Sequence, residues 1–350
     1  MNNRDIIRRL ETEHDLSREE AVFLLNTLGD KDEKLLADAA RKTALDQFGN
    51  KIFIRGLIEI SSYCKNDCYY CGIRRSNRNA VRYRLSEEQI LSCCEQGYAL
   101  GFRTFVLQGG EDGYFTDDRV CAIVRAIKAR YPDCAVTLSL GERGEQSFRR
   151  LYEAGADRYL LRHETADRTH YEKLHPPQMR FDNRMENLRL LKSIGFQTGA
   201  GFMVGSPYQT TENLADDLLF IKAFQPQMCG IGPFVPHKDT DYRDCPHGSL
   251  RMTLILLSVI RLMNPNILLP ATTALGTIDK NGRELGILHG ANVVMPNLSP
   301  QEHRADYSLY DNKISTGEEA AESVALLAEK LKAIGYEIAV GRGDYQDNTN

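Results

Sequence analysis

The sequence lacks two features that would place the chain in a membrane or direct it through one. No stretch approaches the roughly 20 consecutive apolar residues that a bilayer-spanning helix needs. The first residues, MNNRDIIRRLETEHDLS, mix both charges and have no apolar core of the kind that a secretion signal requires. We therefore expect a cytoplasmic protein with no membrane partner.

An excess of positive charge is also lacking. The 44 Lys and Arg residues are outnumbered by 48 Asp and Glu residues, which gives a net charge of −4 and a pI of about 6.1. Proteins that bind nucleic acids carry basic surfaces, so no nucleic-acid partner is expected. The short basic cluster of Arg74, Arg75 and Arg78 is expected to lie in a solvated loop or to bind a small anion.

The hydrophobic pattern predicts an α/β fold with a helical extension. Residues 1–48 have apolar residues at helical spacing and predict three short amphipathic helices. From residue 49 onward, β-rich runs alternate with helix-patterned stretches. The runs are 52–61, 104–109, 135–141, 158–164, 197–205, 230–236, 266–274 and 291–297, and the helical stretches include 86–101, 118–131, 183–195, 211–224 and 250–263.

Eight such repeats fit a (β/α)8 TIM barrel over residues 49–312. A doubly wound open sheet also alternates strands and helices, but the Gly-rich phosphate turn that usually follows its first strand is absent here. Residues 313–350 predict a helix over 318–334 that closes the barrel, followed by a polar tail, GRGDYQDNTN, that frays.

Polar residues collect near the C-terminal ends of the predicted strands, where a barrel carries its active site. They are Cys64, Cys68 and Cys71 after the first strand, Gln108, Gly109, Gly110 and Glu111 after the second, Thr137 and Ser139 on the third, Arg162, His163 and Glu164 on the fourth, His237 after the sixth, Thr272 and Thr273 on the seventh, and Met295 on the eighth. So many polar residues at one end of apolar strands indicate a buried polar ligand.

Three of the nine cysteines lie within eight residues, with the spacing C-x3-C-x2-C and no fourth cysteine nearby. Without a secretion signal, clustered thiols hold metal more often than they form disulfides. One interpretation is a zinc site completed by a distant His or Cys, although zinc sites usually repeat C-x2-C. The other is a 4Fe–4S cluster whose fourth iron has no protein ligand and is open to a substrate or cofactor. The remaining cysteines, Cys93, Cys94, Cys121, Cys134, Cys229 and Cys245, are most simply buried small hydrophobes.

The cysteine spacing, in the loop after the first strand of a parallel barrel, resembles the signature of the radical S-adenosylmethionine (SAM) superfamily. The resemblance implies one 4Fe–4S cluster held by Cys64, Cys68 and Cys71, with SAM chelating the open iron. It places Tyr70 near the adenine, Gly109, Gly110 and Glu111 in the turn that approaches the methionyl ammonium, and Gln108 and Ser139 beside the cofactor. Glu164 would bind the ribose hydroxyls, and Arg184 would bind the methionyl carboxylate.

Five longer stretches are similar to the HydE family of iron-only (FeFe) hydrogenase maturases: 154–166, 199–205, 230–240, 269–278 and 290–297. The resemblance implies a small anionic substrate, an iron–cysteine complex used to assemble the diiron site of the hydrogenase. By their matching positions, the residues assigned to the substrate cavity are Thr137, Ser139, Arg158, Arg162, Thr272, Thr273, Met295 and Tyr310. Implied partners are a reductant such as a flavodoxin or ferredoxin and, transiently, the other hydrogenase maturases. A monomer is expected.

Two related enzymes remain as alternatives. Biotin synthase holds a second cluster through cysteines on interior strands, and the matching strand ends LQGGED, TLSLG and GAGFMVG have none. A methylornithine synthase-like mutase acting on an amino acid is the other, although it lacks the doubled threonine and the HET stretch. A non-catalytic iron–sulfur scaffold would leave the polar strand ends unexplained. Some members of the family bind an accessory cluster after the eighth strand, but here that stretch has Ser315 and no cysteine, so one cluster per chain is predicted.

Overall fold

The computed structural model describes residues 2–314 and 320–347. Ser315 and the first two residues of the helix predicted over 318–334 lie outside the described residues. Within the described part, no helix is both long enough and apolar enough to cross a membrane.

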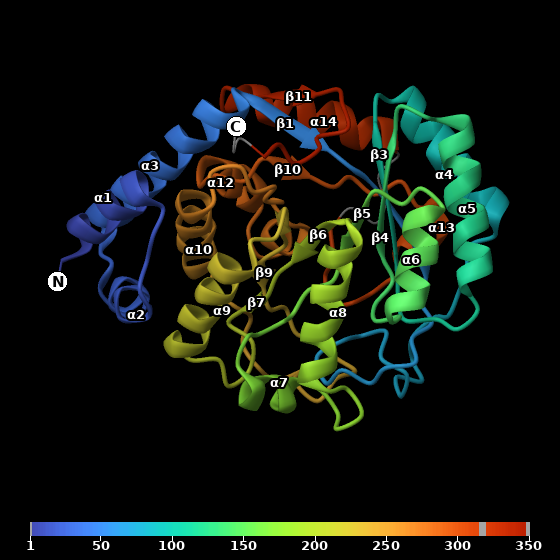
Figure 1. Cartoon of the computed structure of the whole chain (residues 1–350), viewed down its shortest axis with the longest axis horizontal. Helices are drawn as coiled ribbons and strands as arrows, with labels where there is room; N and C mark the ends of the chain where they lie inside the picture. The colour runs from blue at the N-terminus through green and yellow to red at the C-terminus, as the bar shows by residue number, and fades with distance from the viewer. Residues whose placement is uncertain (1, 315–319, 348–350) are drawn as a thin grey trace.

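The N-terminal extension consists of three helices, as predicted: α1 (Asn3–Glu13), α2 (Arg18–Thr27) and α3 (Asp30–Phe48). The side chain of Asn2 caps α1, and Ser17 forms a capping box with Glu20 at the start of α2. These contacts supply partners for backbone N–H groups that a helix start leaves unpaired. Helix α3 packs against α10 (Leu250–Met263), so the extension lies along one side of the barrel (Figure 1).

The strands form a parallel barrel wall. Six of them pair continuously in the order β2-β3-β4-β5-β6-β8, and β10-β1 and β7-β9 form further parallel pairs. Their bounds are β1 (Lys51–Ile54), β2 (Gly56–Ser61), β3 (Thr104–Gly109), β4 (Ala135–Ser139), β5 (Arg158–Leu160), β6 (Gln197–Ala200), β7 (Met203–Val204), β8 (Met228–Cys229), β9 (Gly232–Pro233) and β10 (Val293–Val294). Seven of the eight predicted strands therefore contain regular strand structure.

The predicted seventh strand, 266–274, is the exception. It contributes only isolated bridges, from Leu268 to Met228 and from Pro270 to Val293, and a further bridge joins Leu57 to Asn297. Proline has no N–H group to donate, so Pro270 interrupts a hydrogen-bonded ladder at this point. The (β/α)8 architecture is present, but a continuous ladder does not close the barrel.

Helices cover the outside of the strands (Figure 1). The helices that follow the N-terminal extension are α4 (Glu87–Ala99), α5 (Asp117–Arg130), α6 (Glu145–Glu153), α7 (Arg168–Leu174), α8 (Phe181–Ile194), α9 (Thr211–Phe224), α10, α11 (Thr273–Ile278), α12 (Gly282–Leu288), α13 (Gln301–Arg304) and α14 (Ala320–Ala333). The five helical stretches named from the sequence correspond to α4, α5, α8, α9 and α10.

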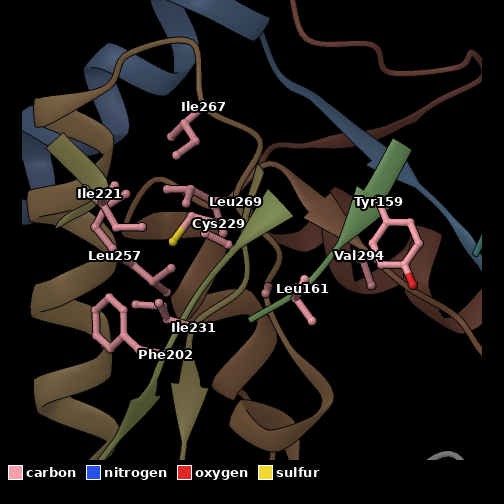
Figure 2. Close-up of a cluster of buried hydrophobic side chains, with 14 of the residues drawn as sticks. Tyr159, Leu161, Phe202, Ile221, Cys229, Ile231, Leu257, Ile267, Leu269 and Val294 are labelled. Carbon is pink, nitrogen blue, oxygen red and sulfur yellow. The ribbon is translucent and has the colours of Figure 1, made fainter. Parts of the chain in front are cut away.

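A continuous hydrophobic core joins strands and helices. Figure 2 shows Phe202, Cys229 and Leu269 from the strand layer packed toward Ile221 of α9 and Leu257 of α10, all of them buried. Five of the six isolated cysteines, Cys93, Cys94, Cys121, Cys134 and Cys229, are buried among apolar residues as predicted. Cys245 is only partly buried, so the prediction does not hold for it.

The prediction of a fraying C-terminal tail is wrong for its described part. An additional strand, β11 (Glu337–Ala339), pairs in parallel with β1. The chain then crosses the N-terminal ends of the barrel strands, which we call the floor. There Arg342 pairs with Asp157 at 2.8 Å, and Asp344 pairs with the fully buried Arg158 at 2.5 Å. These ion pairs and the β11 backbone bonds hold a segment for which the sequence analysis predicted no strand.

Candidate active site

A cavity of about 350 Å³ lies at the C-terminal ends of the strands. Most of the polar residues that the sequence predicts for a site line it. They are Cys64, Cys68, Tyr70, Cys71, Gln108, Gly109, Gly110, Glu111, Ser139, Arg162, Glu164, Arg184, Thr272, Thr273, Met295 and Tyr310. The fold therefore brings together residues that are separated by almost 250 positions in the sequence.

Backbone hydrogen bonds position the cysteine loop against two other segments. Lys65 N donates to the carbonyl oxygen of Glu111 at 2.8 Å, and Gly72 N donates to that of Leu309 at 2.9 Å. A Cβ atom on Gly110 would come within 2.2 Å of the Tyr63 carbonyl oxygen, so only glycine allows this close approach. The loop is thus fixed on one wall of the cavity.

The three thiols share a poorly hydrated environment. Burial raises the pKa of Cys68 well above its usual value, and the neighbouring Cys71 and Cys64 thiols raise it further. Burial likewise raises the pKa of Cys71 to about 12. Among the described residues, no three potential ligands gather as they would around a single metal ion. Three thiols facing one cavity suit a larger group such as a cluster, which must displace their protons on binding.

Tyr70 is held by a buried histidine. Nδ1 of His175 lies 2.9 Å from the carbonyl oxygen of Tyr171, and Nε2 lies 3.1 Å from the Tyr70 hydroxyl. Burial lowers the pKa of His175 to about 3, so the ring is neutral. A carbonyl only accepts, so Nδ1 carries the proton and Nε2 accepts from Tyr70. This contact fixes the Tyr70 ring on the cavity wall.

The carboxylate of Glu111 is occupied by partners within the protein. Its Oε1 accepts from Glu142 N at 3.0 Å, and its Oε2 lies 3.0 Å from Lys65 Nζ. A Cβ atom on Gly141, which has φ +76°, would come within 2.0 Å of the Glu111 side chain. The carboxylate therefore ties the cysteine loop to the end of β4, and Gly109, Gly110 and Glu111 all border the cavity.

Glu164 and Arg162 carry the clearest sign of a missing ligand. Nη2 of Arg162 lies 3.0 Å from Oε2 of Glu164, but their geometry does not make a hydrogen bond. Both atoms, together with Nε of Arg162, are buried and have no hydrogen-bond partner among the described residues. Glu164 also adopts φ +67°, a conformation that costs roughly 1–3 kcal/mol for such residues. Strain and buried polar atoms without hydrogen-bond partners at one point indicate a site built for a polar ligand.

Arg184, by contrast, is firmly held on α8. Nε donates to Glu142 at 2.6 Å, and Nη1 donates to the carbonyl oxygen of Arg162 at 2.6 Å. Burial alone would lower the pKa of Arg184, but the negative charges that Tyr171 and Glu142 can carry outweigh it, so the pKa is raised. The side chain is therefore a permanent, oriented cation in the cavity wall.

The opposite wall carries hydroxyl groups. Thr272 Oγ1 is buried without a hydrogen-bond partner in the described part of the chain, and Gly232 leaves room for it because a Cβ there would lie 2.7 Å away. Thr273 Oγ1 accepts from Arg283 at 3.3 Å. Both threonines line the same cavity as Arg162, so their hydroxyl groups can donate or accept hydrogen bonds to a ligand bound there.

Two residues assigned to the cavity do not line it. Arg158 begins β5 at the barrel floor, where Asp344 and Thr104 bind its guanidinium. Thr137 is one strand repeat deeper than Ser139 and is buried with Oγ1 unpartnered among the described residues. The alternation of strand side chains gives the face of a residue but not its depth along the barrel.

The cavity also contains a buried ion pair that the sequence analysis missed. Glu59, on β2, accepts from Lys313 Nζ at 2.5 Å and from Asn297 Nδ2 at 3.0 Å. Lys313 also donates to the carbonyl oxygen of Tyr307 at 3.0 Å. Burial raises the pKa of Glu59, while Lys313 opposes that shift. The sequence did contain a signal for this ion pair, because Glu59 is a carboxylate within the mostly apolar strand β2.

Comparison with known proteins identifies the family. Residues 58–221 match the model of the radical SAM superfamily. The chain is 41% identical to the FeFe-hydrogenase maturase subunit HydE of Thermotoga maritima, over 96% of this chain and 95% of that protein. It is 31% identical to the 3-methylornithine synthase of Methanosarcina barkeri, over 86% of this chain and 84% of that protein.

A solved structure agrees with these matches. The crystal structure of methylornithine synthase (PylB) superimposes with a TM-score of 0.82 at 26% identity, covering 95% of this chain and 97% of that one. The motif, the polar cavity and the full-length similarity therefore agree: the chain belongs to the HydE family of FeFe-hydrogenase maturases, within the radical SAM superfamily.

Proposed function

We propose that Cys64, Cys68 and Cys71 hold a 4Fe–4S cluster and that the cavity beside them binds SAM and a small anionic substrate. When bound, the cluster supplies one electron that cleaves SAM reductively to methionine and a 5′-deoxyadenosyl radical. The observation that carries the proposal is the gathering of three partly buried thiols and of buried polar atoms without hydrogen-bond partners around one cavity. The residues present fit both groups.

In this proposal, four parts of the chain orient SAM. The Tyr70 ring, fixed by His175, packs beside the adenine. Oε2 of Glu164, which faces Arg162 but has no hydrogen-bond partner among the described residues, accepts from the ribose hydroxyls. Arg184 donates to the methionyl carboxylate, and the backbone of Gly109 and Gly110 accepts from the ammonium group. Gln108 and Ser139 border the same end of the cavity.

Arg162 and the two threonines are proposed to hold the substrate. Nε and Nη2 of Arg162 have no hydrogen-bond partner in the described residues, so they favour an anion. Thr272 offers its hydroxyl from the facing wall, with Thr273, Met295 and Tyr310 completing the pocket. The similarity to the Thermotoga HydE supports a cysteine-derived iron complex, used in assembling the diiron site of FeFe-hydrogenase, as that substrate.

The segment 307–313 is proposed to exclude water from the reaction. Tyr307, Leu309, Tyr310 and Lys313 line the cavity. The segment is fastened on both sides, since Gly72 N binds the Leu309 carbonyl and Asp311 N binds that of Pro236. A reactive radical requires such a dry site, because water would otherwise compete for side reactions.

An amino-acid substrate is the alternative function, and the similarity to 3-methylornithine synthase favours it. We expect the cytoplasmic protein, reconstituted anaerobically with iron and sulfide and given dithionite and SAM, to form 5′-deoxyadenosine. An iron–cysteine complex bearing carbon monoxide and cyanide should accelerate that formation, whereas L-lysine should not. Acceleration by L-lysine alone would replace the maturase function with the mutase function. No 5′-deoxyadenosine under any condition would refute both.

A further inference from the structure

The loop that carries the three cysteines is strongly basic on its outer side. Between residues 62 and 86 the only carboxylate is Asp67, although the whole chain has more acidic than basic residues. The basic residues of this segment are Lys65, Arg74, Arg75, Arg78, Arg82 and Arg84. The cluster of Arg74, Arg75 and Arg78 has no part in the proposed SAM site.

The structure separates these cations into two groups. Arg74 pairs with Asp67 at 2.9 Å, and Arg82 donates to four backbone carbonyl oxygens of the segment, so both hold the loop in shape. Arg75 and Arg78 are exposed, and the ion pairs found in the described residues do not involve them. Their charges are therefore directed to the solvent.

A second group of exposed residues is joined to them through Arg82, whose guanidinium binds the carbonyl oxygens of both Ser62 and Asn77. In this group two tyrosines and two arginines alternate in a stack. The Arg84 guanidinium lies 3.9 Å from the ring centre of Tyr63 and 4.9 Å from that of Tyr114, and the Arg119 guanidinium lies 4.0 Å from that of Tyr114. Asp112 binds Arg84 through two hydrogen bonds, of 2.7 and 2.9 Å, which makes the stack rigid. Tyr63 and Tyr114 are 36% and 38% exposed. Rigid, exposed aromatic and arginine side chains are typical of protein interfaces.

Only the cysteine-bearing loop separates the exposed ring of Tyr63 from the cavity. Tyr63 is exposed, and the next residue, Cys64, lines the cavity. Adjacent Cα atoms are only about 3.8 Å apart. A redox centre that contacts Tyr63 would therefore lie close to the thiols. On other sides of the molecule, the barrel would stand between the redox centre and the thiols.

We propose that this basic face, defined as Tyr63, Arg75, Arg78, Arg84, Tyr114 and Arg119, is the docking surface for a small acidic protein that carries a low-potential redox centre. The proposal rests on the proposed function. The partner gives up one electron and is oxidised by one equivalent, and the cluster held by the three cysteines is reduced by one. The partner's carboxylates pair with the exposed arginines, and the stacked tyrosines supply the apolar contact.

Charge complementarity favours this partner over a nucleic acid. The net charge of the chain is −4, so the chain as a whole repels an acidic partner, and exposed arginines attract it locally. A nucleic acid needs a longer basic track than these six residues provide. Transient redox complexes bury little surface, so a face of about six residues is sufficient.

The test compares two triple variants that carry the same change in net charge. R75E/R78E/R119E alters the basic face, and R8E/K34E/R189E alters exposed cations on α1, α3 and α8. The probe is an oxidised acidic ferredoxin, and its affinity for the reconstituted protein is measured by titration calorimetry at low and at high salt. We expect the first variant to weaken binding by about tenfold or more, the control to change it by less than about twofold, and high salt to abolish it in the wild type.

SAM cleavage provides the second measurement. With dithionite, which needs no docking, both variants should match the wild type. With reduced ferredoxin, only R75E/R78E/R119E should be slow. Equal weakening of ferredoxin binding by both variants, or no weakening, would overturn the docking proposal while leaving dithionite-driven cleavage intact. Absence of cleavage with dithionite would instead contradict the proposed function, and the binding comparison would still decide the docking surface.

Discussion

Arg158 and Arg162 lie four residues apart in the same segment, but their guanidinium groups have different surroundings at the two ends of the barrel. At the floor, Arg158 is fully buried and bound by Asp344, Thr104 and Gln197. At the cavity, Arg162 keeps two buried nitrogens without a hydrogen-bond partner in the described chain. The protein supplies hydrogen-bond acceptors to the first guanidinium, whereas the second faces Glu164 at 3.0 Å without a hydrogen bond. The partners of a charged group, rather than its residue type or its strand, therefore distinguish a supporting role from a binding role.

The same contrast applies to the cysteines. Cys68 and its two neighbours border the cavity, where other thiols are close enough to raise their pKa values. Cys134 lies at the floor end of β4 among apolar side chains. Both environments raise thiol pKa values by burial, but only the cavity thiols face a space that can hold a ligand.

The largest expected effect comes from replacing a cysteine with alanine at each end of the barrel and comparing the two variants. Cys68→Ala should abolish SAM cleavage, because the cluster loses one of three ligands, while the thermal midpoint of the cluster-free protein changes little. Cys134→Ala should keep iron and cleavage but lower the free energy of unfolding by about 1–2 kcal/mol through the cavity it creates. Iron content, 5′-deoxyadenosine and urea unfolding would be measured on both. Full iron loading of Cys68→Ala would contradict the assignment.

A second, smaller effect is expected from replacing each of the two arginines with methionine. Arg162→Met should lower kcat/KM for the substrate roughly 10- to 100-fold, since hydrogen bonds to charged groups contribute about 1.5–3 kcal/mol, and should leave stability nearly unchanged. Arg158→Met should do the reverse and lower the free energy of unfolding by about 3 kcal/mol, because it leaves Asp344 without its buried partner. Steady-state kinetics and urea unfolding distinguish the two. If both variants lost stability equally, the contrast between the ends would fail.

The smallest expected effect concerns pH at the floor. Burial would raise the pKa of Asp344, but its bonds to Arg342 and the charge of Arg158 outweigh burial and lower it to about 2. The unfolded value is about 3.9. The ionised carboxylate thus stabilises the fold above about pH 4, and this contribution is lost as the pH falls toward 2. After allowance for its partial exposure we expect about 1 kcal/mol.

Asp344→Asn is the matched variant for that prediction. The wild type should lose about 1 kcal/mol more than Asp344→Asn between about pH 5 and pH 2 in urea unfolding. Parallel losses in the two proteins would mean that the floor ion pair does not depend on ionised Asp344.

The sequence predicted the barrel, the cysteine loop and most of the cavity wall, because strand alternation and short motifs are local. It missed the ion pair of Glu59 with Lys313, since those residues are 254 positions apart and meet only in the folded chain. The family resemblance placed Arg158 in the cavity, but its side chain lies at the floor, bound to Asp344. The sequence analysis missed β11, although Tyr336, Ile338 and Val340 alternate along it, because the strand is three residues long and pairs with the distant β1.

The most direct test of the central claim is the electron paramagnetic resonance spectrum of the reduced, reconstituted protein before and after addition of SAM. Three cysteine ligands leave one iron open, so we predict about four irons per chain and a spectrum that changes when SAM is added. The same change should be absent in Cys68→Ala. A spectrum that SAM leaves unaltered, or one tightly bound zinc in place of iron, would contradict the account.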